Sequence, residues 1–128
     1  AYYWVLVTQI AEVLGVSKTE VHNGLLNDYG QLDMEDGQVM SVVLKESIDW
    51  KKLPQIHLRP TSKVIENSKG TLYRVYYVVR GSHNYDSKEM SMLINGCVYE
   101  AQELGIETLT PDEIKRMLQA WQKKDGAS

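Results

Sequence analysis

The spacing of apolar residues changes twice along this chain, and this change limits what the chain can fold into. Over residues 3–14, 90–104 and 114–121 they recur every three or four positions, as a helix with one buried face requires. Residues 38–80 are instead rich in β-branched and tyrosine residues, which is typical of strands. Helices near both ends and strands between them predict an α+β fold with an antiparallel sheet.

Cap and turn residues divide these regions into elements. The first predicted helix runs up to Gly15, and the second begins at the capping box Ser17/Glu20 and ends near Tyr29. A turn over 33–37 and strands over 38–45, 63–66 and 71–80 follow. The third helix runs from the capping box Asp86/Glu89 to Gly105, and the last begins at Thr110-Pro111. The predicted order is therefore ααβββαα: a helical hairpin, a three-stranded antiparallel sheet and two C-terminal helices.

The length and the cysteine content indicate one self-sufficient unit. We expect a single domain over residues 1–128, with 105–128 as a C-terminal helical arm, and further residues before Ala1 because the helical pattern begins at once. One cysteine, Cys97, excludes an intramolecular disulfide and favours a reducing, cytoplasmic setting. No apolar run approaches the ~20 residues that span a bilayer, so we expect no membrane partner.

Charge is distributed unevenly, although the net charge is only −3. Residues 45–88 contain nine Lys and Arg against four Asp and Glu, a net charge of +5. The rest of the chain has five positive against thirteen negative residues, a net charge of −8. Such segregation suits a protein that meets a polyanion on one face, although ordinary variation in surface charge could also produce it.

Motifs for catalysis and for metal or cofactor binding are absent. The three histidines are far apart in the sequence, Cys97 falls on the core stripe of its predicted helix, and no phosphate-binding or nucleophile motif occurs. We therefore expect no enzyme and no cofactor. Dispersed carboxylates such as Glu12, Asp33 and Asp36 leave a metal-dependent nuclease of branched DNA as an alternative.

The first two predicted helices carry a helix-turn-helix pattern. Ala11 permits close approach of the helices, and Gly15 can supply the positive φ of the turn. The would-be recognition helix offers Lys18, His22 and Asn23 to DNA against the acidic Glu20 and Asp28, which is a poor set for reading bases. We therefore interpret the pair as a structural hairpin and keep a sequence-specific regulator as an alternative.

The strand over residues 71–80 gives the stronger DNA-binding signal. Alternation places Tyr73 and Tyr77 on a face suited to the core and Arg74, Tyr76 and Arg80 on the other face, where arginines can contact phosphates and tyrosine can stack on a base. The interpretation that Tyr76 only completes the sheet stays open. With the connection 51–63 and the polar loop after the strand, the predicted DNA-binding groove comprises Arg59, Lys63, Arg74, Tyr76, Arg80, His83 and Lys88.

Two segments resemble a known family. The run Tyr76-Tyr77-Val78-Val79-Arg80-Gly81-Ser82-His83-Asn84-Tyr85-Asp86-Ser87-Lys88-Glu89-Met90, then a helix ending Glu103-Leu104-Gly105-Ile106 and a last helix with Trp121, is similar to the C-terminal half of NinB/Orf proteins. Ala1-Tyr2-Tyr3-Trp4 resembles the family's aromatic start. The family's Arg-Ser-Leu-x-x-Asn signature is absent, and Asn84 and Asp86 stand where its loop bears arginine.

The resemblance implies a homodimeric phage or prophage recombination accessory protein acting in the cytoplasm of a bacterial host. It implies binding of single-stranded and branched DNA, contact with a single-strand-binding protein, and help in loading a recombinase. Trp4 and Trp121 are the residues that we expect at the dimer or partner interface, because large exposed aromatics often mark interfaces.

Overall fold

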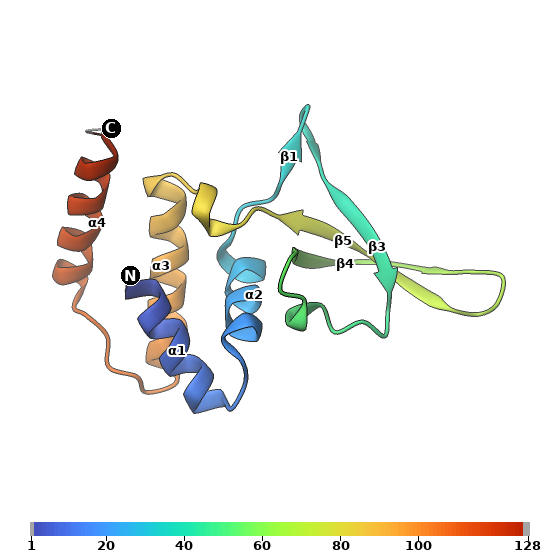
Figure 1. The fold of residues 1–128 in the computed structure, drawn as a ribbon, viewed down its shortest axis with the longest axis horizontal. Coiled ribbons are helices and arrows are strands. Elements are labelled where there is room, and N and C mark those ends of the chain that lie inside the picture. Colours follow the sequence, from blue (N-terminus) through green and yellow to red (C-terminus); the bar gives the residue numbers. More distant parts are fainter. Residues whose placement is uncertain (1, 127–128) are drawn as a thin grey trace.

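The structure is a computed structural model that describes residues 2–126, with side chains through residue 121. A group of helices occupies one side of the molecule and a twisted antiparallel sheet the other (Figure 1). The predicted α+β class and the order ααβββαα are confirmed. Residues 1 and 127–128 of the predicted domain lie outside the described part. Among the described helices, none is both long and apolar enough to cross a bilayer.

The N-terminal helices form the predicted hairpin. Helix α1 spans Tyr2–Leu14 and α2 spans Lys18–Tyr29, and Gly15 turns between them with φ +69°, a conformation that favours glycine. The Ser17 side chain accepts a hydrogen bond from the backbone N–H of Glu20 and so satisfies a free donor of the first turn of α2. The cap fixes where α2 begins and therefore which of its residues face α1.

The main sheet has the strand order β3-β5-β4, with β3 at Ser41–Lys45, β5 at Leu72–Val79 and β4 at His57–Glu66. Both pairings are antiparallel, and the register of β4 on β5 shifts between Pro60 and Val64. The predicted start of this strand at Lys63 was wrong, because β4 begins at His57 and continues through Pro60. Proline is tolerated here because β4 is an outer strand.

A second, two-stranded sheet precedes β3. Strands β1 (Met34–Glu35) and β2 (Gln38–Val39) pair around a turn in which Asp36 and Gly37 have positive φ values of 50° and 78°. The turn predicted over 33–37 is confined to Asp36 and Gly37, because Met34–Glu35 forms β1, and the predicted single strand over 38–45 is divided into β2 and β3 at Met40. This acidic hairpin therefore lies at the N-terminal end of β3 (Figure 1).

The C-terminal half returns to the helices through a short 3-10 turn, Ser82–Asn84. Helix α3 spans Ser87–Glu103 and begins with the predicted capping box between Asp86 and Glu89, and α4 spans Pro111–Gly126. Gly105 has φ +77° directly after α3. The hydroxyl of Tyr2 accepts a hydrogen bond from the Leu109 N–H at 2.9 Å, which ties the segment before α4 to α1.

The hydrophobic core lies among the helices. Its buried members come mainly from α1, α2 and α3, with Ile114 from α4 and Val79 from the end of β5. Leu58 and Tyr76 are also buried, yet they stand apart from this cluster. The helices therefore support the sheet at the end of β5 near Val79, and the hairpin of β4 and β5 projects away from them (Figure 1).

Candidate nucleic-acid interface

Two of the three predicted DNA-binding arginines are paired with carboxylates. On β5, Arg74 donates to both carboxylate oxygens of Glu46, at 2.8 and 2.6 Å, and to the Thr61 carbonyl at 2.7 Å. These hydrogen bonds lower the pKa of Glu46, so the carboxylate stays charged beside the guanidinium. Arg80 forms an ion pair with Glu89 of α3. Each pair is neutral as a unit and has little to offer a phosphate.

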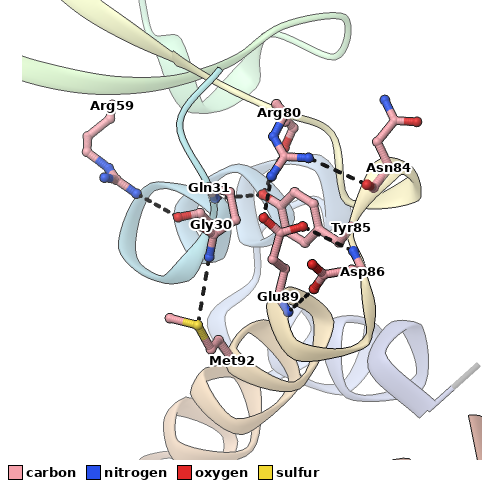
Figure 2. A network of polar contacts seen from close by, with 9 residues as sticks. All are labelled: Gly30, Gln31, Arg59, Arg80, Asn84, Tyr85, Asp86, Glu89 and Met92. Carbon is pink, nitrogen blue, oxygen red and sulfur yellow. Dashed lines mark hydrogen bonds and ion pairs between the residues drawn. The ribbon is translucent and has the colours of Figure 1, made fainter. Parts of the chain in front are cut away.

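Arg80 also belongs to a network at the junction of β5, α3 and the segment after α2 (Figure 2). The Tyr85 hydroxyl donates to the Arg80 carbonyl at 2.9 Å and accepts from the Gln31 N–H at 2.8 Å. The Arg80 guanidinium lies 5.3 Å from the centre of the Tyr85 ring. Because so many of its groups are engaged within the protein, Arg80 holds the junction together.

The third arginine, Arg59, caps a helix. At the C-terminal end of α2, its Nε donates to the Asn27 carbonyl at 2.8 Å. Its Nη2 donates to the Gly30 carbonyl at 3.1 Å (Figure 2). A cation at this end satisfies free carbonyls and favours the helix dipole. Arg59 and Arg80 therefore belong to one polar network beside the end of α2, whereas Arg74 is paired with Glu46 elsewhere on the sheet, and all three predicted arginines are engaged by groups of the protein.

The predicted roles of the two central tyrosines of β5 must be exchanged. Tyr76 is only 2% exposed, so it has no free ring face for a base, whereas its neighbour Tyr77 is 39% exposed. Neither face of β5 is buried or exposed along its whole length, since Leu72 on the face of Tyr76 is 46% exposed and Val79 on the face of Tyr77 is buried. The exposed ring lies on the face that had been assigned to the core.

The strand register defines the surface around Tyr77. Cross-strand partners point to the same side of a sheet, and Tyr73 pairs with Lys45 and Ile65, Val75 with Val43, and Tyr77 with Ser41 and Arg59. We call this surface the Tyr77 face; its members used below are Val43, Lys45, Ile65, Tyr73, Val75 and Tyr77. Val43, Ile65 and Tyr77 are exposed large hydrophobic residues within it.

Unlike the arginines, several lysines of the sheet remain available to contact a phosphate. Lys45 on β3, Lys63 on β4 and Lys69 in the hairpin turn are exposed, and none forms an ion pair with another described side chain. Lys88, near the start of α3, is exposed in the same way. Of the predicted site residues, Lys63 and Lys88 thus have no ion-pair partner among the described side chains, and Lys45 and Lys69 were missed because sequence spacing does not reveal which cations lack partners.

The three histidines are distant in the sequence but adjacent in space. The rings of His22 and His57 lie 5.3 Å apart, and His57 and His83 line one open cleft of about 310 Å³ beside Arg80. His83 is exposed in the turn before Tyr85. Among the described residues, no group of three or more His, Cys, Asp or Glu is arranged to hold a metal ion.

Of the two residues that the helix-turn-helix alternative offers to DNA, Asn23 is packed inside the molecule and Lys18 is exposed. Asn23 donates to the carbonyls of Lys51 and Leu53, both at 2.8 Å, and its side-chain oxygen lies 2.7 Å from His57 Nδ1. Asn23 is buried, so it cannot reach a base. The interpretation of α1 and α2 as a structural hairpin fits this packing.

The two tryptophans expected at an interface lie on different sides of α1. Trp4 is partly exposed and rests against His22, with 4.6 Å between ring centres. Trp121 is partly exposed at the end of an apolar cavity of about 170 Å³ that Tyr2, Tyr3 and Met117 also line. Both rings are partly used in internal packing, and their role with a partner stays a prediction.

Comparisons with known proteins give no relative: no family model, no curated protein and no solved structure matches this chain. Function must therefore be argued from the arrangement of the side chains.

Proposed function

We propose that this chain binds nucleic acid, single-stranded or branched DNA above all, through the Tyr77 face and the lysines beside it. The observation that carries the proposal is an exposed tyrosine on an open sheet face that also bears Lys45, a cation without a carboxylate partner among the described side chains. An aromatic ring beside a free cation is the combination that binds single strands without regard to sequence.

The energetics favour a single strand over a duplex. Tyr73 and Tyr77 lie on one strand, about 13 Å apart, and each can stack on one base only if that base is unstacked from its neighbours. One stacked base is worth about 1–3 kcal/mol. The lysines add phosphate contacts that lower affinity as salt rises.

The resemblance to NinB/Orf proteins extends the proposal to phage-type recombination, beside a single-strand-binding protein or a recombinase. In this chain, however, the residues of the resembling segment, such as Arg80 and Tyr85, hold the junction of β5 and α3. The proposed contact with DNA therefore rests on the Tyr77 face.

The first experiment measures binding to a labelled single strand and to the matching duplex by fluorescence anisotropy. Tyr77→Ala is expected to weaken single-strand binding about tenfold, because it removes one stacked base. Tyr99→Ala is the matched control, since Tyr99 is an exposed tyrosine of α3, away from the sheet. Equal affinities for wild type and Tyr77→Ala would refute the stacking role.

The second experiment tests the lysines through salt. The triple variant Lys45→Gln, Lys63→Gln, Lys69→Gln should reduce the slope of log K against log salt by about 2, since each phosphate contact to a single strand contributes about 0.7. The control variant Lys18→Gln, Lys115→Gln removes exposed helix lysines and should keep the wild-type slope. If the triple variant leaves the slope unchanged, these lysines do not contact the phosphates and the proposed interface is wrong.

A further inference from the structure

The sheet ends at β3, and the outer edge of this strand is open. In the order β3-β5-β4, β3 pairs with β5 alone. On either side of β3, the Met40 carbonyl accepts from the Val78 N–H and the Glu46 N–H donates to the Leu72 carbonyl, both at 2.9 Å, so the even-numbered positions of β3 are the ones that pair with β5. Because these directions alternate along an antiparallel strand, Ser41, Val43 and Lys45 direct theirs outward.

These outward groups have almost no partners. Within the described residues, only the Lys45 carbonyl is engaged, by the Ile48 N–H at 3.0 Å, and a carbonyl can accept a second bond. All three residues are exposed, and β3 has no strand partner other than β5 among the described residues. An unpaired edge of this kind is a template for another strand.

The opposite edge of the same sheet is protected. There β4 contains Pro60, which has no N–H to offer, and a register shift between Pro60 and Val64 interrupts the strand. No proline occurs within β3, whose ladder to β5 is regular. The two edges therefore differ in kind, and only the edge of β3 is suited to pairing.

We propose that β3 pairs with β3 of a second copy of this chain, antiparallel about Val43. In this register the two Val43 residues exchange two backbone hydrogen bonds, and each Ser41 exchanges two with the Lys45 of the other copy. The six bonds use every outward group of both edges. The result is a continuous six-stranded sheet with a two-fold axis at Val43.

The distribution of charge along the chain favours a second copy as the partner of β3 and an antiparallel direction of pairing. The acidic hairpin with Asp33, Glu35 and Asp36 precedes β3, whereas Lys45 ends it and the next acid, Glu46, is already neutralised by Arg74. Antiparallel pairing brings the lysine end of each copy toward the acidic end of the other. Parallel pairing would bring acidic end to acidic end.

Pairing would also join the Tyr77 faces of the two copies across the Val43 pair. The proposal does not rest on nucleic-acid binding, however, because it concerns backbone groups at an edge and is tested by mass. The dimer is measured as mass without nucleic acid, whereas stacking is measured with Tyr77→Ala, so the failure of one proposal is distinguishable from the failure of the other.

The test is the mass of the whole chain in solution over a range of concentrations, by sedimentation equilibrium. We expect a dimer, and Val43→Lys should raise its dissociation constant about tenfold or more, because two lysines would then lie directly opposite each other. Met92→Lys is the control, since Met92 on α3 is 51% exposed and Val43 is 52% exposed. A monomer at every concentration would overturn the proposal.

A cross-link tests the register itself. Directly opposed residues of a hydrogen-bonded antiparallel pair have Cα atoms about 5.5 Å apart, within the range of a disulfide. Mild oxidation should convert Val43→Cys to a covalent dimer, whereas Met92→Cys should stay monomeric on a denaturing gel. The native Cys97 is buried and does not interfere. A dimer that Val43→Lys leaves intact and Val43→Cys does not cross-link would place the contact on another surface.

Discussion

Acid should weaken this fold through His22, and the size of the effect follows from its surroundings. His22 Nδ1 lies 2.7 Å from the Tyr3 hydroxyl, the Trp4 ring lies against it, and the His57 ring is 5.3 Å away. Burial, and after it the charge of His57, lowers the pKa of His22 to about 4 from its ordinary 6.5. The unfolded chain therefore binds a proton in a pH range where the folded chain does not.

The sign of the effect follows from this difference. The stability contributed by neutral His22 is fully present above pH 6.5 and is lost as the pH falls through about 4. The whole loss is about 3 kcal/mol, and about 2 kcal/mol of it falls between roughly pH 7.5 and pH 5. His57, whose pKa burial also lowers, adds to the loss in the same direction.

Urea unfolding followed by circular dichroism at these two pH values measures the effect. The midpoint of the wild-type chain should fall by about 1 M urea. His22→Gln keeps an acceptor for the Tyr3 hydroxyl, but glutamine does not bind a proton in this pH range. Only the part of the stability loss that is due to His57 should therefore remain. His83→Gln removes an exposed imidazole whose charge lowers the pKa of His57 less than burial does, so it should keep most of the wild-type change. A His22→Gln midpoint that falls as steeply as that of wild type would refute the reasoning.

Two further predictions concern packing. Gly96→Ala would place a Cβ 2.3 Å from Cγ of the Tyr29 ring and should lower the free energy of unfolding by about 2 kcal/mol. Gly24 has open space around it, so Gly24→Ala should raise the free energy of unfolding by about 1 kcal/mol. Urea unfolding measures both changes. Burial raises the pKa of the Cys97 thiol to about 12, so a maleimide should label this thiol only as the chain unfolds, and rapid native labelling would contradict its burial.

Local signals were sufficient to predict most of the elements. The capping box of Asp86 and Glu89, the cap at Ser17 and the glycines 15 and 105 act within a few residues, so the sequence contains all that they need. The start of β4 was missed because the effect of Pro60 depends on whether its strand is central or outer. That position in the sheet is set by distant segments.

The candidate site was harder to predict, because charge counted along a sequence ignores partners in space. Glu46, the partner of Arg74, is 28 residues away, and Glu89, the partner of Arg80, lies one residue beyond the basic stretch 45–88. The burial of Tyr76 was equally hidden, since alternation divides a strand into two faces without saying which is covered. The free lysines and the exposed Tyr77 could be found only after these partners were known.

The gathering of His22, His57 and His83 has a practical consequence. All the imidazole rings of the chain lie where the helices meet the sheet, and none lies elsewhere to obscure them. A sample labelled with ¹⁵N in histidine alone would give ring resonances from this boundary only. Spectroscopy could then follow whether the two parts stay joined when the protein meets DNA, acid or a second copy of itself.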